Sequence, residues 1–289
     1  MLNEVKKLKL AFSSCPNDTF MFHALVHGLV DTEGLAFDVD IYDVEELNER
    51  AQRGVYDVSK LSYHGWFTVR DAYAMLDAGS ALGWDCGPLL VRRAGDDAVL
   101  ERRPLRIAIP GRYTTGALLC TLAYPGLGEQ VPMLFSEIEG AVSCGEADLG
   151  VLIHEGRFTY RDKGLELVRD LGAWWQAYSG APIPLGGIAI KRSLGPEIAA
   201  SFNRVLHRSI THAFAHPEDS RAYVASYARE LSAAIQRKHI DLFVNAFSLD
   251  LGEEGHRAVD TLYQCYERID QHGGSQEALP RGRQCGAGA

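Results

Sequence analysis

The sequence lacks long apolar stretches and any excess of positive charge. No uninterrupted apolar run approaches the roughly 20 residues that a membrane-spanning helix needs, so no membrane partner is expected. Lysine and arginine number 29 against 38 aspartates and glutamates, which gives a net charge of −9. Because an acidic chain repels phosphate backbones and no basic stripe interrupts it, a nucleic-acid partner is not expected either.

Cysteine is scarce, and the histidines form no complete metal-binding pattern. There are six cysteines in 289 residues, and no two form a C-x-x-C pair, unlike disulfide scaffolds or zinc fingers. His23 with His27 and His212 with His216 have helical spacing, but no third ligand follows at a recognisable interval, so no metal is predicted. The apolar run after the first lysines is shorter than the core of a secretion signal, about 7–15 residues. We therefore expect a reduced, cytoplasmic protein.

Several familiar catalytic and nucleotide-binding motifs are also missing. The chain contains no phosphate-binding G-x-x-x-x-G-K-[ST] loop, no G-x-S-x-G nucleophile elbow and no dinucleotide fingerprint. Its composition, 46% hydrophobic and 23% charged, is that of an ordinary globular protein. At this length we expect two domains rather than one.

Strand-like segments alternate with helix-like segments along the chain. A polar loop at 13–19 separates an apolar strand from a helical pattern, and the loop at 110–116 does the same. Asp43 is predicted to begin a helix, with Glu46 as its capping-box partner. The predicted strands are residues 8–12, 35–42, 105–109 and 149–153. This alternation predicts an α/β protein with largely parallel sheets.

Two short sequence patterns each occur twice in the chain, which is consistent with two similar lobes. Segments 54–58 and 145–149 both read G-x-x-D followed by an apolar residue and run into a strand. Segments 87–93 and 186–192 are glycine-led apolar strands that end in two cations. If the latter pair lie side by side as crossing strands, residues 97–184 form a small inserted lobe, and 1–96 with 185–289 form a discontinuous large lobe. This is the two-lobed architecture of class II periplasmic-type binding proteins, with a central cleft.

His154 is the leading candidate for catalysis. It follows a fully apolar strand, so we expect it at the carboxyl edge of a sheet, where α/β proteins place their sites. An imidazole there can act as a general base near neutral pH. The alternative is a histidine that only forms a hydrogen bond at a strand end.

Polar side chains at three other strand ends are candidates for substrate binding. Thr114 and Thr115 precede a helix and, with its free N–H groups, are expected to bind a carboxylate or phosphate, although a plain helix cap explains them too. Asn17 and Asp18 lie in the corresponding loop of the first lobe. Cys15, in the same loop, is interpreted as packing rather than as a nucleophile.

Ser59 and Ser62 occupy the end of the strand that follows segment 54–58 in the first lobe, the position that corresponds to His154. They complete the set of candidate substrate-binding residues. The sequence leaves the oligomeric state open.

Six ordered motifs resemble a known enzyme family. Residues 13–20, SSCPNDTF, resemble the S-P-C-P-N-D-T-F segment of 1,4-dihydroxy-6-naphthoate synthases of the futalosine route to menaquinone, with Ser14 where the family usually has proline. The other motifs, in the same order as in the family and within residues 8–192, are KLSY at 60–63, GRYTT at 111–115, HEG at 154–156, DLG with a double tryptophan at 170–175, and PIPLGG at 182–187.

The resemblance implies a carbon–carbon lyase without a cofactor or metal. Its substrate would be cyclic dehypoxanthine futalosine, a small carboxylate, and its products 1,4-dihydroxy-6-naphthoate and dihydroxyacetone. The family's proposed base corresponds to His154. Its ligand-binding positions correspond to Ser62, Thr114 and Thr115.

Two alternatives stay open at this point. Chorismate dehydratase, the sister enzyme of the same pathway and fold, lacks the C-P-N-D-T-F loop found at residues 15–20. A non-enzymatic small-anion-binding protein shares the fold, but a transport receptor would need an export signal.

Overall fold

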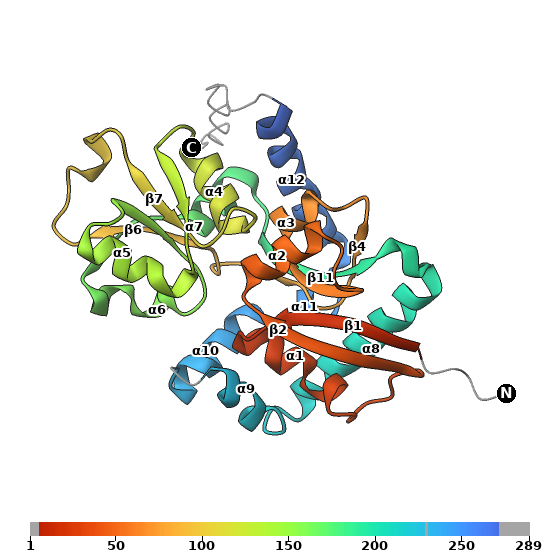
Figure 1. The fold of residues 1–289 in the computed structure, drawn as a ribbon. Helices are drawn as coiled ribbons and strands as arrows, with labels where there is room; N and C mark the ends of the chain where they lie inside the picture. The colour runs from red at the N-terminus through yellow and green to blue at the C-terminus, as the bar shows by residue number, and fades with distance from the viewer. Residues whose placement is uncertain (1–5, 229–230, 272–289) are drawn as a thin grey trace, which may run out of the picture.

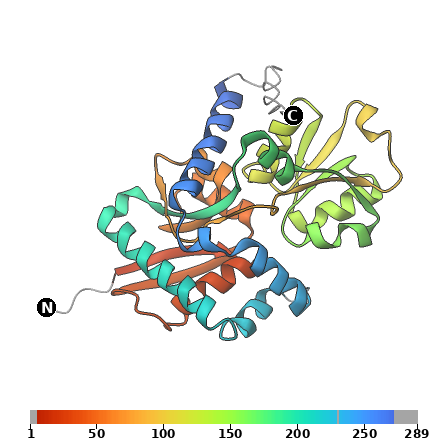
Figure 2. The same cartoon turned by 180° about the vertical axis from the view of Figure 1, so that it is seen from behind.

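The computed structural model describes residues 6–228 and 231–271. The chain forms two mixed sheets, each with helices packed around it, as Figures 1 and 2 show from opposite sides. The two sheets define the first lobe, at the lower right of Figure 1, and the second lobe, at the left.

The first sheet has the order β2-β1-β3-β11-β4, with β5 also paired to β11. Its strands are β1 (Lys6–Ser13), β2 (Leu35–Tyr42), β3 (Val58–Ser62), β4 (Tyr73–Met75), β5 (Ala81–Gly83) and β11 (Ile183–Lys191). Strands β1, β2 and β3 are parallel, whereas β11 runs antiparallel to its neighbours. The sheet is therefore parallel only in part, not largely parallel as the alternation predicts.

The second sheet has the order β10-β6-β9-β7-β8. Its strands are β6 (Leu89–Arg93), β7 (Arg106–Ile109), β8 (Glu129–Pro132), β9 (Leu149–Leu152) and β10 (Leu165–Asp170). Here β7, β8 and β9 are parallel, and β6 is antiparallel to β9 and β10. In each sheet, the middle one of the three parallel strands leads into a helix that reaches the site.

The helices cover the sheets and connect the lobes. They are α1 (Pro16–Val26), α2 (Val44–Gln52), α3 (Tyr63–Phe67), α4 (Thr115–Ala123), α5 (Ile138–Cys144), α6 (Gly156–Thr159), α7 (Leu171–Ser179), α8 (Pro196–Ala215), α9 (Arg221–Tyr227), α10 (Ala233–Phe243), α11 (Ala246–Leu249) and α12 (Gly252–Gln271). Short 3₁₀ turns lie at Val99–Glu101, Phe135–Glu137, Tyr160–Lys163 and Arg192–Leu194. None of the helices within the described ranges is both long and apolar enough to cross a membrane.

The buried apolar core continues from one lobe into the other. One cluster joins Tyr63 and Leu82 of the first lobe to Ile107 and Trp175 of the second, with Leu262 of α12 packed among them. A separate cluster lies between the first sheet and the helices α1 and α8. Because burial of apolar area is the dominant stabilising term in folding, this shared cluster holds the two lobes against each other.

The prediction that the two glycine-led strands lie side by side is wrong. The glycine-led strands are not neighbours, because β6 pairs with β9 and β10 in the second sheet while β11 pairs with β3, β4 and β5 in the first. Sheet pairing therefore assigns β6 to the second sheet, although the predicted limit at residue 96 puts it in the large lobe. The pattern that the two segments share, an apolar strand followed by two cations, therefore indicates only that both are buried strands with exposed ends.

The start of α2 also differs from its prediction. The Asp43 side chain accepts a hydrogen bond from the Glu45 backbone N–H, so it caps the helix as expected. Glu46, however, accepts from Arg50 one turn later instead of completing a capping box. The salt bridge within the helix competes successfully for that carboxylate.

Candidate active site

A cavity lies where the carboxyl ends of the parallel strands of both sheets meet. Its wall includes Ser13 at the end of β1, Ser62 at the end of β3, Thr114 after β7 and Ile153 after β9. The empty space, counting its open mouth, is about 680 Å³. This is the edge at which α/β folds bind small molecules, and the size suits a small organic ligand.

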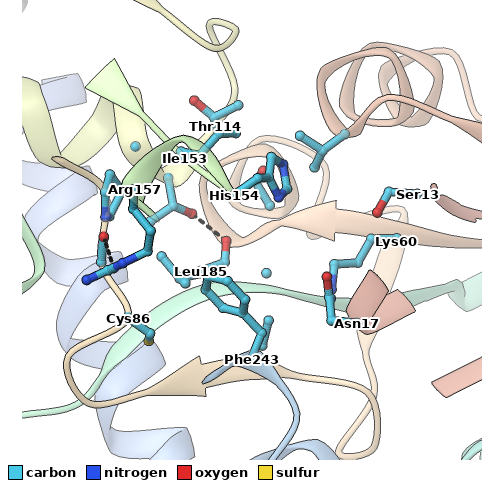
Figure 3. A pocket seen from close by; sticks show the side chains of 18 of the residues that line it. Ser13, Asn17, Lys60, Cys86, Thr114, Ile153, His154, Arg157, Leu185 and Phe243 are labelled. Atoms are coloured by element: carbon cyan, nitrogen blue, oxygen red, sulfur yellow. Dashed lines mark hydrogen bonds between the residues drawn. The ribbon is translucent and has the colours of Figure 1, made fainter. Parts of the chain in front are cut away.

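His154 lies on the cavity wall directly after β9, as the sequence predicts. Its φ is 54°, a left-handed conformation uncommon for a residue with a side chain. Phe135 packs edge-on against the ring at 4.9 Å between centroids, and the ring of His239 stacks on it at 5.9 Å and 10°. In Figure 3 His154 lies between Arg157 and Cys86 on one side and Ser13, Lys60 and Asn17 on the other.

Cys15 contacts this histidine from the first lobe. Its Sγ lies 3.4 Å from His154 Nδ1 and 3.8 Å from Nε2. Burial, followed by the negative charge of Asp18, raises the pKa of the Cys15 thiol far above its ordinary value. The sulfur is therefore a thiol and not a nucleophilic thiolate, in line with the interpretation of Cys15 as a packing residue.

Thr114 and Thr115 both reach the cavity, but their hydroxyl hydrogens are directed elsewhere. Thr114 Oγ1 donates to the Gly111 carbonyl and accepts from the Ala117 N–H, so it is the N-cap of α4. Thr115 Oγ1 donates to the Leu185 carbonyl across the lobe boundary. What this helix start offers to an anion is therefore its first backbone N–H groups rather than the two hydroxyls.

The first lobe holds this helix start in place. His64 Nδ1 lies 3.2 Å from the Thr114 carbonyl, and the Glu45 carboxylate accepts from the Tyr113 N–H at 3.0 Å. Burial lowers the pKa of His64, which favours the neutral ring that donates to the carbonyl. Residues of the first lobe thus position the N-terminus of α4, which belongs to the second lobe.

Asn17 lines the cavity, whereas Asp18 lies behind the wall. Asp18 is fully buried and accepts from the Ser13 N–H, the Ser13 hydroxyl and the Asn17 amide. Its Oδ1 also lies 3.0 Å from the Lys60 ammonium. The structure therefore places Asp18 where it orients Lys60 and Asn17, not where it contacts a ligand.

The two serines of β3 differ in the same way. Ser62 lines the cavity, and its hydroxyl oxygen accepts from Asn48. Ser59 is fully buried away from the cavity, and its hydroxyl donates to the Lys60 carbonyl. Side chains alternate along a strand, which explains why residues three apart on β3 point to opposite faces.

Three basic cavity residues, Lys60, Arg157 and His239, are not among the predicted site residues. Lys60 is in the KLSY motif, but a buried lysine within a strand cannot be told from a surface lysine by its sequence. Arg157, one turn after His154, donates to the Gly87 carbonyl at 2.5 Å and lies 3.8 Å from Asp170. His239 is on α10, in a helical region without a motif. Burial identifies Lys60 and His239, and the position of Arg157 on the cavity wall identifies Arg157.

The described residues contain no group of three or more histidine, cysteine, aspartate or glutamate side chains placed to hold a metal ion. The rings of His23 and His27 are tilted against each other at the end of α1, and those of His212 and His216 are tilted in the same way at the end of α8.

Comparison with known proteins gives a consistent result. Residues 8–268 match a family described as menaquinone biosynthesis. The chain is 44% identical to a 1,4-dihydroxy-6-naphthoate synthase of Thermus thermophilus, over 90% of this chain and 93% of that protein. It is 42% identical to the enzyme of the same name from Streptomyces coelicolor, over 88% of this chain and 91% of that protein.

Solved structures agree with this likeness. A crystal structure of an Archaeoglobus fulgidus protein has a TM-score of 0.85 and 37% identity, covering 92% of this chain and 98% of that one. An alkanesulfonate-binding protein of Xanthomonas axonopodis pv. citri has a TM-score of 0.67 at 11% identity, covering 96% of each chain. The second likeness shows the periplasmic-binding-protein fold alone.

Proposed function

The chain belongs to the menaquinone biosynthesis family, and from this premise we propose that it is a 1,4-dihydroxy-6-naphthoate synthase. As a carbon–carbon lyase it cleaves cyclic dehypoxanthine futalosine, a small carboxylate, to 1,4-dihydroxy-6-naphthoate and dihydroxyacetone. The likeness to two enzymes of that name over most of the chain supports the proposal. A cytoplasmic location, expected from the sequence, stays a prediction.

The observation that carries the mechanism is the position of His154 on the cavity wall. Its Nδ1 is the ring nitrogen nearer to the Cys15 sulfur, so a hydrogen assigned to Nδ1 leaves the Nε2 lone pair for the substrate. Nε2 then removes the proton of a sugar hydroxyl. The carbon–carbon bond breaks as the C=O bond of the departing fragment forms, and its electrons flow into the ring system, which becomes aromatic. A positioned general base contributes roughly 10²–10⁴ in rate.

The substrate carboxylate binds at the start of α4. The first-turn N–H groups of Thr115 and Gly116 have no acceptor within the helix, and the first turn of α4 contains no acidic residue. Arg157, which also lines the cavity, adds a guanidinium that suits a carboxylate. Ser62 supplies a further hydroxyl on the opposite wall.

The proposal is tested by incubating the purified protein with cyclic dehypoxanthine futalosine and recording the appearance of naphthoate absorbance. We expect turnover by the wild-type protein and a loss of at least about 10²-fold in kcat for His154→Ala. His27→Ala, a histidine at the end of α1 outside the cavity wall, serves as the control and should keep wild-type kcat. Near-wild-type turnover by His154→Ala would remove the proposed base.

The same assay separates the alternatives. A small-anion-binding protein would bind the ligand and return it unchanged. A chorismate dehydratase would consume chorismate, which we expect this protein to leave intact.

A further inference from the structure

Two buried polar atoms on the cavity wall have no hydrogen-bond partner among the described residues. They are Nζ of Lys60 and Nδ1 of His239. Lys60 is 5% exposed and His239 is 0% exposed. Lys60 Nζ lies 3.0 Å from Asp18, but this ion pair does not have the geometry of a hydrogen bond. A buried polar group without a partner is costly, so both atoms point to a ligand group that satisfies them.

A chain of contacts fixes which of these atoms donates and which accepts. Asn17 Nδ2 donates to Asp18 Oδ1 at 2.9 Å, which orients the amide so that its oxygen faces His239. That oxygen lies 2.9 Å from His239 Nε2, and because an amide oxygen can only accept, Nε2 carries the hydrogen. Burial, and then the charges of His154 and Lys60, hold the pKa of His239 well below its ordinary value. The ring is thus neutral, and Nδ1 is a bare acceptor.

The cavity therefore presents an ammonium donor and an imidazole acceptor from the same network. A hydroxyl group matches this pair, since its oxygen accepts from Lys60 and its hydrogen is donated to His239 Nδ1. A carboxylate fits poorly because it has no hydrogen for Nδ1 and would approach the buried Asp18. A carbonyl would satisfy only Lys60.

We propose that Lys60 and His239 form a hydroxyl-binding subsite for the sugar-derived fragment of the substrate, and this inference rests on the proposed function. The rings of His239 and His154 are stacked 5.9 Å apart, so the bound hydroxyl lies next to the one from which His154 takes a proton. The subsite thus selects a fragment with neighbouring hydroxyls and orients it toward the base. Asp18 and Asn17 are positioning residues, because they act through Lys60 and His239.

The test uses His239→Gln, which keeps one half of the histidine's contacts. A glutamine amide can still donate to Asn17 in place of Nε2, but it offers no acceptor at the position of Nδ1. Binding of intact substrate is measured by calorimetry in a His154→Ala background, which does not turn the substrate over. We expect the dissociation constant to rise about 5- to 100-fold. Affinity for 1,4-dihydroxy-6-naphthoate, which lacks the sugar fragment, should be unchanged.

A matched control and a second variant keep the result interpretable. His23→Gln changes a buried histidine outside the cavity wall and should leave substrate affinity unchanged. If His239→Gln fails to fold, Lys60→Met combined with Asp18→Asn removes both buried charges together and should weaken substrate binding in the same selective way.

The outcomes separate this inference from the proposed function. Equal substrate affinity with and without His239→Gln, or an equal loss of product affinity, would overturn the subsite while wild-type turnover leaves the lyase intact. If the wild type does not turn over the futalosine substrate, titration of the ¹⁵N-labelled protein with dihydroxyacetone tests the hydroxyl-binding subsite independently of the lyase activity. A shift of the His239 Nδ1 resonance would support a hydroxyl site, and no shift would overturn it.

Discussion

The helices α1 and α4 begin in equivalent places but present different chemistry to the same cavity. Each follows the middle one of three parallel strands, β1 in the first sheet and β7 in the second. Both helix starts contribute to the cavity wall, α1 through Asn17 and α4 through Thr114, Thr115 and Gly116. A helix N-terminus carries a partial positive charge, so either could attract an anion.

The difference lies in the first turn. Helix α1 has its own carboxylate there, Asp18, buried and paired with Lys60. Helix α4 has no acidic residue in its first turn, and Arg157 lies on the same cavity wall. An internal anion therefore balances the start of α1, which suits the proposed binding of hydroxyls there, whereas the start of α4 has no internal anion, which suits the proposed binding of the substrate carboxylate.

Removing the internal anion of α1 should have the largest effect. Asp18→Ala leaves the buried Lys60 ammonium unpaired, which typically costs about 3–5 kcal/mol of unfolding free energy. Urea unfolding measures the change. Asp38→Ala breaks an exposed pair with Lys7 and should cost at most about 1 kcal/mol, so a similar small cost at Asp18 would contradict the proposed balance.

Removing Arg157, the cation near α4, should have the second-largest effect. Arg157→Met is expected to raise the KM for the futalosine substrate and the dissociation constant of the naphthoate product about 10- to 100-fold, since a charge-assisted hydrogen bond contributes about 1.5–3 kcal/mol. The control is Arg169→Met, which removes an exposed arginine on β10 outside the cavity wall. Equal affinities in the two variants would place the carboxylate elsewhere.

Patterns in the sequence predict the local elements of this comparison well. The strand and loop before each helix, and the position of His154 at a strand end, follow from apolar runs and turn-forming residues. These signals are local, because strand propensity and helix capping depend on neighbours along the chain. The pairing of β6 could not be predicted in this way, since it depends on which distant strands bury its faces.

The roles of the polar residues were harder to predict for a related reason. Asp18 and Ser59 are buried polar residues near strand ends, like Asn17 and Ser62, yet only Asn17 and Ser62 line the cavity. Lys60 and His239 become candidates only when they are seen as buried atoms without hydrogen-bond partners. Composition and spacing do not record burial, so the donor and acceptor of the hydroxyl subsite emerge only from the three-dimensional arrangement.

The smallest effect is expected at Thr114, the N-cap of α4. Thr114→Val removes the bond from the Ala117 N–H to Oγ1 and the one from Oγ1 to the Gly111 carbonyl. Loss of such a cap costs about 0.5–2 kcal/mol of unfolding free energy, and a frayed helix start should weaken product binding a few-fold. Thr114→Ser keeps the hydroxyl and should restore both values. If Thr114→Val instead lowered affinity as much as Arg157→Met while stability stayed unchanged, the hydroxyl itself would be the anion ligand, and the carboxylate would have displaced the contact with Gly111.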